Sequence, residues 1–145
     1  MTETPITPSK VSADEMNAFF QSLAMGRTLR QHVESASDGE VVMRYDCGPG
    51  NLRPGGFISG PTQMALADSV AYAVVFTRAG ITPMALTSNL NINFLRPCQG
   101  ETLEARGTLL KYGKSGVVVE VEVRGSSSEK VSSHATVTYV LPPKE

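Results

Sequence analysis

The sequence predicts an α+β domain in which an antiparallel β-sheet wraps around one long central α-helix. The stretch from Thr62 to Phe76 is small and apolar on nearly every side, as expected of a helix that other elements cover. After Gly80 the apolar residues alternate with polar ones, which is typical of strands. The expected order is a short helix, one strand, the long helix and about four strands, and such a sheet must bury its apolar face against the helix.

The 145 residues fit a flexible lead-in over residues 1–10 and one domain over residues 11–145. A net charge of −1 and 6% aromatic residues offer no basic surface or stacking platform for nucleic acid. The N-terminal residues lack the apolar core of a secretory signal, and the longest apolar run falls short of the roughly 20 residues that cross a membrane. We therefore expect a soluble cytoplasmic protein that binds neither nucleic acid nor membranes.

The first helix is predicted from about Ala13 to Met25, because Ser12 and Glu15 have the spacing of a capping box. A strand over residues 40–45 leads into a loop, CGPGNLRPGGFISGP, which is rich in glycine and proline. Ser59 is a favoured N-cap, so a helix of about 20 residues should follow and end near Gly80. Later strands are predicted over residues 86–94, 101–110, 116–124 and 130–140.

Cysteine and histidine residues are too sparse for a metal site or a catalytic triad. Cys47 and Cys98 stand alone, so we expect two buried or half-buried thiols. His32 and His134 have no visible partner in the sequence and are interpreted as structural or exposed. No metal or redox cofactor is expected.

Asp68 is the one charged residue near the middle of the long apolar helix. A carboxylate that leaves water must be paired, hydrogen-bonded or neutralised, so this position is a candidate for chemistry. The structural alternative is a carboxylate that simply accepts a hydrogen bond from a hydroxyl, such as that of Ser69, Tyr72 or Thr87.

Four segments together resemble the hotdog-fold thioesterases, most closely the branch with the phenylacetate-pathway acyl-CoA thioesterases. They are Ser59-Gly60-Pro61, Leu66-Ala67-Asp68-Ser69, TSNLNINFLRP over residues 87–97 and SHATVTY over residues 133–139. The likeness covers residues from about 40 to 140. One departure is clear, because the family typically has His-Gly-Gly where this chain has Ser59-Gly60-Pro61.

The resemblance implies four catalytic positions. The backbone N–H of Gly60 would stabilise an oxyanion, Asp68 would act as general base or nucleophile, and Thr87 and Asn51 would assist. Physical chemistry agrees with the first two roles, because a helix N-terminus offers unpaired N–H groups and a carboxylate can activate water or attack a thioester directly. Ser59, Ser69, Arg53, Arg96 and Lys114 are the predicted substrate-binding residues, and the basic ones would face the phosphates of coenzyme A.

The spacing of Gly60 and Asp68 predicts a shared site. Eight residues on one helix correspond to about 12 Å, too far for both residues to reach one reacting group. Two antiparallel copies of the helix can bring them together, so we expect an obligate homodimer, and hotdog dimers often pair again into tetramers. The leading hypothesis is an acyl-CoA thioesterase that needs no cofactor, since coenzyme A is part of the substrate. The alternative is a hotdog dimer that binds acyl-CoA without hydrolysing it.

Overall fold

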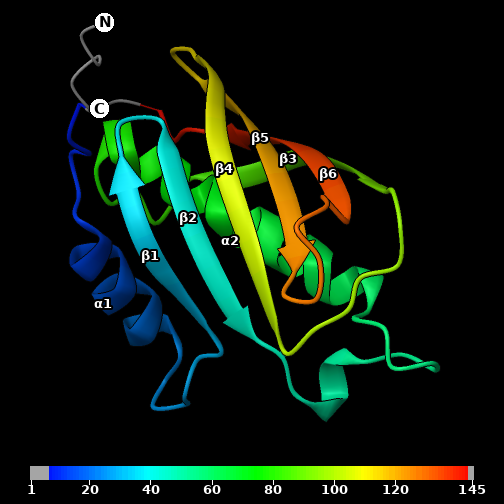
Figure 1. Ribbon diagram of the computed structural model, residues 1–145. Helices are drawn as coiled ribbons and strands as arrows, with labels where there is room; N and C mark the ends of the chain where they lie inside the picture. Colours follow the sequence, from blue (N-terminus) through cyan, green and yellow to red (C-terminus); the bar gives the residue numbers. More distant parts are fainter. Residues whose placement is uncertain (1–6, 144–145) are drawn as a thin grey trace, which may run out of the picture.

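A six-stranded antiparallel sheet curves around the long helix α2 in the computed structural model, which describes residues 7–143. Figure 1 shows α2 behind the strands and the short helix α1 beside β1. The strand order is β1-β2-β4-β5-β6-β3. The elements are α1 (Ala13–Leu23), β1 (Gln31–Ser37), β2 (Glu40–Asp46), a 3₁₀ turn (Pro49–Asn51), α2 (Gly60–Ala79), β3 (Leu86–Phe94), β4 (Thr102–Tyr112), β5 (Gly116–Gly125) and β6 (Ser133–Val140).

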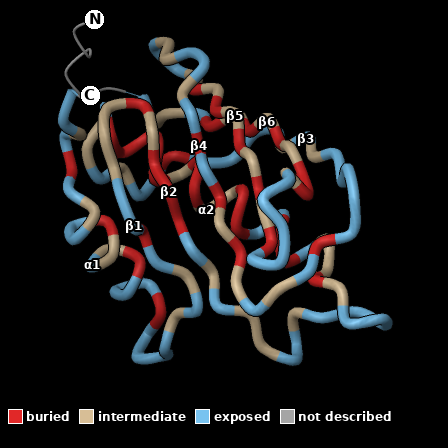
Figure 2. Tube along the Cα trace, viewed as in Figure 1, coloured by how far each residue is buried: buried red, intermediate tan, exposed pale blue. Residues whose placement is uncertain are grey.

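The core lies between the inner face of the sheet and α2. Buried and half-buried residues alternate along β5 and β6, and Figure 2 shows this alternation next to a largely buried α2. Val117, Val119, Val121 and Val123 of β5 are all fully buried on the inner face. Because a strand points successive side chains to opposite faces, the partly exposed glutamates of β5 must point outward. This is the hotdog fold, and the predicted fold class is confirmed.

Local signals set the ends of both helices. Ser12 and Glu15 form the predicted capping box, but α1 ends at Leu23, because Met25 adopts a left-handed φ of 52° that no α-helix can include. The hydroxyl of Ser59 caps α2, which ends as predicted before Gly80.

The prediction of a single strand before the long helix is wrong, because β1 also precedes it. β1 pairs antiparallel with β2, yet Val33 is its only buried residue. The side-chain amide of Asn17 accepts from the N–H of Val33 at 2.7 Å and donates to its C=O at 2.9 Å, which ties α1 to this strand. A strand with one buried side chain has no apolar alternation for sequence analysis to detect.

The predicted lead-in lies partly outside the described residues, which begin at Thr7. The carbonyl of Thr7 accepts a hydrogen bond from the N–H of Asp38, and the N–H of Lys10 donates to Thr77. Within residues 7–143, neither helix is long and apolar enough to cross a membrane.

Candidate active site

Asp68 lies half-buried on α2, and two hydroxyl groups hold its carboxylate. Thr87 Oγ1 and the hydroxyl of Tyr139 each lie 2.8 Å from Oδ1 of Asp68. Thr87 and Tyr139 are direct partners in the pairing of β3 with β6, so their side chains share the inner face of the sheet. The other oxygen, Oδ2, makes no hydrogen bond to any described residue. One carboxylate oxygen is therefore held while the other can face a water or a substrate.

Tyr139 is a hydrogen-bond donor in this arrangement. Only 4% of its surface is exposed, and its ring stacks on that of Tyr72 with centroids 5.4 Å apart. Burial, reinforced by the nearby Asp68 carboxylate, raises the pKa of Tyr139 well above its ordinary value of 10.0. The phenol therefore keeps its proton and donates a hydrogen bond to the carboxylate.

The N-terminus of α2 presents one unpaired N–H group, that of Gly60. Pro61 has no N–H, and the N–H groups of Thr62 and Gln63 donate to the side chain and carbonyl of Ser59 at 3.3 and 3.2 Å. The N–H of Gly60 makes no hydrogen bond within residues 7–143. A Cβ at this position would lie 3.2 Å from the ring of Phe94, so glycine leaves space beside the free donor.

Asn51 fastens the glycine-rich loop to the start of α2. Its side chain donates to the hydroxyls of Tyr45 at 3.0 Å and Thr62 at 3.3 Å, and accepts from the N–H of Gly48 at 2.8 Å. Its carbonyl accepts the N–H of Ser59 at 2.9 Å. These contacts position the N-terminus of α2, and they use both the oxygen and the nitrogen of the Asn51 side-chain amide.

A hollow of about 660 Å³ opens beside Gly60. The predicted residues Arg53 and Arg96 are exposed at its mouth, and Arg96 also donates a hydrogen bond to the carbonyl of Val131. Its walls are mostly apolar, as an acyl group would require. They are formed by Pro54, Phe57, Ile58, Gly60, Pro61, Gln63, Phe94, Pro97 and Cys98. Burial raises the pKa of the Cys98 thiol above its ordinary 9.0.

The remaining predicted residues lie elsewhere. Ser59 uses its hydroxyl to cap α2, and Ser69 lines a separate hollow of about 300 Å³ beside α1. Lys114 is exposed in the turn between β4 and β5, at the end of the sheet where Val117 pairs with Tyr139. The structure thus shows two groups of residues on one chain, Asp68 with Thr87 and Tyr139, and Gly60 with Arg53 and Arg96.

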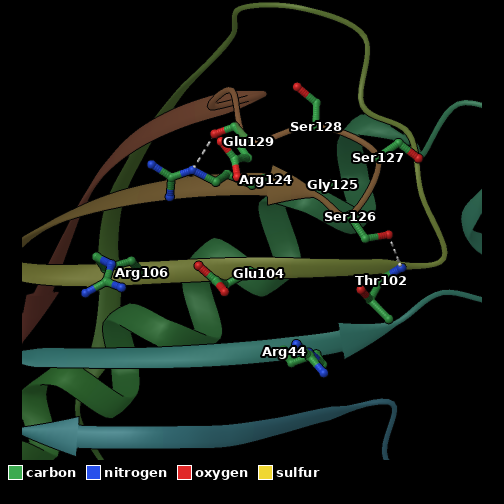
Figure 3. Close-up of a pocket in the computed structure, with 10 residues that line it drawn as sticks. All are labelled: Arg44, Thr102, Glu104, Arg106, Arg124, Gly125, Ser126, Ser127, Ser128 and Glu129. Carbon is green, nitrogen blue, oxygen red and sulfur yellow. Dashed lines mark hydrogen bonds between the residues drawn. The ribbon is translucent and has the colours of Figure 1, made fainter.

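A second large hollow, of about 580 Å³, lies on the outer face of the sheet. Figure 3 shows its arginines on neighbouring strands, with α2 on the far side. Arg44, Arg106 and Arg124 lie 3.1, 2.6 and 2.9 Å from carboxylate oxygens of Glu34, Glu40 and Glu122. Because each arginine already has a partner and α2 lies behind the sheet, we interpret this hollow as part of a solvated, charged face.

Two contacts were not anticipated from the sequence. Tyr139 was expected only as part of a strand, although the alternation of β6 places it on the buried face with Ala135 and Val137. His134 pairs with Glu120 at 2.7 Å, because β5 and β6 are adjacent.

The chain matches known proteins in sequence and in fold. Residues 55–140, more than half of the chain, match the profile of the thioesterase superfamily. Among curated proteins, none matches this chain.

Several solved structures share the fold. A protein assigned as a thioesterase from Silicibacter sp. TM1040 superposes with a TM-score of 0.83 at 29% identity, covering 94% of this chain and 96% of that one. Zebra fish thioesterase superfamily member 2 superposes at 0.79 with 18% identity, covering 92% and 100%. A variant of the phenylacetic acid degradation protein PaaI from Thermus thermophilus superposes at 0.69 with 22% identity, covering 86% and 99%. The two more distant structures support the fold alone, whereas the profile match shows that this chain belongs to the thioesterase superfamily.

Proposed function

We propose that the protein is an acyl-CoA thioesterase, which hydrolyses a thioester to a carboxylic acid and coenzyme A. The observation that carries the proposal is the arrangement of Asp68, whose Oδ1 accepts two hydroxyl hydrogen bonds while Oδ2 has no partner among the described residues. A carboxylate held at one oxygen and open at the other suits a reaction in which the open oxygen meets water or a carbonyl carbon.

The proposed reaction begins when the N–H of Gly60 polarises the thioester carbonyl. In the general-base route, Asp68 takes a proton from water as the water oxygen attacks the carbonyl carbon, the C–S bond breaks, and that proton passes to the leaving thiolate. In the nucleophilic route, Oδ2 attacks and forms an anhydride while the thiolate leaves. Water then cleaves the anhydride, which restores the carboxylate and supplies the proton that the thiolate takes. Thr87 and Tyr139 hold the carboxylate in either route.

The proposal requires Gly60 of one chain and Asp68 of another, because about 12 Å of helix separates them within one chain. Support for a homodimer comes from β3, a nine-residue strand at the edge of the sheet. A long unpaired edge with apolar side chains is an association surface. The exposed apolar residues on and beside this strand are Met84, Leu86, Phe94, Leu95 and Val140, with Met64 on α2.

Coenzyme A would then contact basic residues of both chains. Arg53 and Arg96 border the hollow at Gly60. Lys114 lies in the turn before β5, near the end of that strand that pairs with Tyr139, a hydrogen-bond partner of Asp68. Coenzyme A esters are intracellular compounds, so the proposal places the enzyme in the cytoplasm.

Steady-state hydrolysis of a panel of acyl-CoAs tests the proposal, with Asp68→Asn as the comparison. The substitution keeps the shape of the side chain and removes its charge, so we expect a loss of at least about 100-fold in kcat. If wild type and Asp68→Asn show the same background rate while both bind acyl-CoA, the protein is a binding protein and the enzymatic proposal fails.

A further inference from the structure

The sheet has two edge strands, and they differ in what covers them. β1 and β3 are the outer strands of the order β1-β2-β4-β5-β6-β3. No other described segment pairs with the free side of β3, and exposed apolar side chains lie on and beside this strand. Figure 1 shows α1 beside β1. A bare strand edge offers backbone N–H and C=O groups to any other strand, so the edge that stays bare decides how copies of the chain can join.

The side chain of Asn17 occupies the free side of β1 as another strand would. Its Oδ1 accepts from the N–H of Val33 at 2.7 Å, and its Nδ2 donates to the C=O of the same residue at 2.9 Å. In an antiparallel pair, a residue exchanges both of these bonds with the residue opposite it. The amide of Asn17 therefore takes the place of a neighbouring backbone, and an incoming strand would have to displace it before pairing at Val33.

Two further features interrupt the β1 edge beyond Val33. The register of β1 against β2 shifts between Val33 and Ser35, which leaves Glu34 without a partner in β2. Near the end of the strand, Ser37 forms a bridge with Pro8. A shifted register disrupts the regular spacing that an added strand needs, and proline has no N–H with which to extend a ladder. Together with Asn17, these features protect β1 from Val33 to Ser37.

The edges that meet determine whether an assembly closes. Two β3 edges can meet about a two-fold axis, and such a contact uses both edges and stops at two chains. A β3 edge that met a β1 edge would leave one edge of each kind free, so the same contact could repeat without end. Protection of β1 removes the second kind of contact.

We propose that Asn17 closes the β1 edge to strand addition, so that copies of this chain join through β3 alone. The inference concerns assembly and goes beyond the proposed thioester hydrolysis, on which it does not depend. An amide is the required side chain, because a carboxylate lacks the donor for the C=O of Val33 and an apolar side chain lacks both groups.

The first test removes the amide. Asn17→Leu keeps the size of the side chain and favours the helix, and Asn17→Ala serves in its place if the first variant does not fold. Amide hydrogen exchange at Val33 should become at least about 10-fold faster than in wild type. In sedimentation the wild-type mass should not change with concentration, whereas the mass of the variant should grow to at least about twice the wild-type value. Unchanged exchange at Val33, or an unchanged mass despite faster exchange, overturns the inference.

The second test separates an opened edge from a loosened helix. Phe20→Leu is the matched control, because it weakens the packing of a buried residue of α1 and leaves the amide of Asn17 in place, so it should keep the wild-type mass. Growth of this control to the same extent overturns the inference. Ser35 is exposed on β1, and adding Ser35→Lys to Asn17→Leu should restore the wild-type mass, because a lysine on an edge strand opposes pairing. Continued growth of the double variant would show that the copies do not join at β1, and overturns the inference.

Discussion

The hydroxyl of Tyr139 lies 2.8 Å from Oδ1 and 3.1 Å from the backbone carbonyl oxygen of Asp68, a residue 71 positions away in the chain. A phenol has one proton, and both acceptors near it belong to the same residue. This contact links β6 to α2 at the Asp68 carboxylate. The position of Asp68 is therefore set by the sheet as well as by its own helix.

Replacing Tyr139 by Phe should weaken both stability and activity. The ring can still stack on Tyr72, so the change removes only the hydroxyl. We expect the free energy of unfolding to fall by about 1 to 2 kcal/mol, because a buried hydrogen bond to a carboxylate is lost. Urea unfolding measures this, and kcat should fall at least several-fold in the same protein. Unchanged kcat with lowered stability would show that Tyr139 is only structural.

Thr87 offers a cleaner test of the carboxylate's orientation. Thr87→Val keeps the branched shape but removes the donor to Oδ1 of Asp68, so kcat should fall by about 10-fold. Thr87→Ser keeps the hydroxyl and should stay close to wild type. Thr136→Val, on the outward face of β6, is the matched control and should leave kcat unchanged. Equal activity of the Val and Ser variants at position 87 would contradict the proposed role.

The homodimer is tested by placing charge on the edge strand. Leu86 is 65% exposed in the single chain, at the start of β3. If β3 lies in the interface, Leu86→Arg should bury an unpaired charge there, and sedimentation should show monomers together with lost hydrolysis. Leu23→Arg is the control, because Leu23 is 56% exposed at the end of α1, and it should stay dimeric and active. An active monomer would rule out the shared site.

Gly107 tests how closely the helix approaches the sheet. A Cβ at this position of β4 would lie 2.9 Å from Val74 Cγ2, and Val74 is a stiff β-branched residue of α2. Gly107→Ala should therefore lower the free energy of unfolding by about 1 to 3 kcal/mol in urea. Gly50→Ala has nothing within 4 Å of its new Cβ and should change stability by less than about 0.5 kcal/mol. Equal stability of the two variants would contradict the observed packing.

Alkaline pH should destabilise the protein. Burial raises the pKa of Cys47 and Cys98 above 9.0, and that of Tyr72 and Tyr139 above 10.0. The unfolded chain therefore releases these protons at lower pH than the folded protein does, so the stability they provide is complete below pH 9.0 and is lost as pH rises through the folded values. Urea unfolding should show a declining free energy between about pH 9 and about pH 11, and Tyr139→Phe should decline less. A constant value over this range would contradict the burial of these groups.

Much of the fold was predictable because its signals are local. The capping box of Ser12 and Glu15, the N-cap Ser59 and the helix-ending Gly80 act within a few residues, and the alternation of β5 is complete within one strand. The profile match to residues 55–140 confirms the predicted family. Strand β1 was missed because it has no apolar alternation of its own. Its contacts with α1 and its pairing with β2 in the folded protein make it a strand.

Local patterns along the chain were enough to predict a sheet around a long apolar helix, with the lone carboxylate Asp68 on that helix and the cap at Ser59. The contacts of Thr87 and Tyr139 with this carboxylate, and the lack of a donor to Oε1 of Gln63 among residues 7–143, become visible only in the folded chain. The physical reason is distance along the chain. Helix caps and strand alternation depend on neighbours in sequence, whereas a hydrogen bond across 71 residues depends on the order and register of every strand between them.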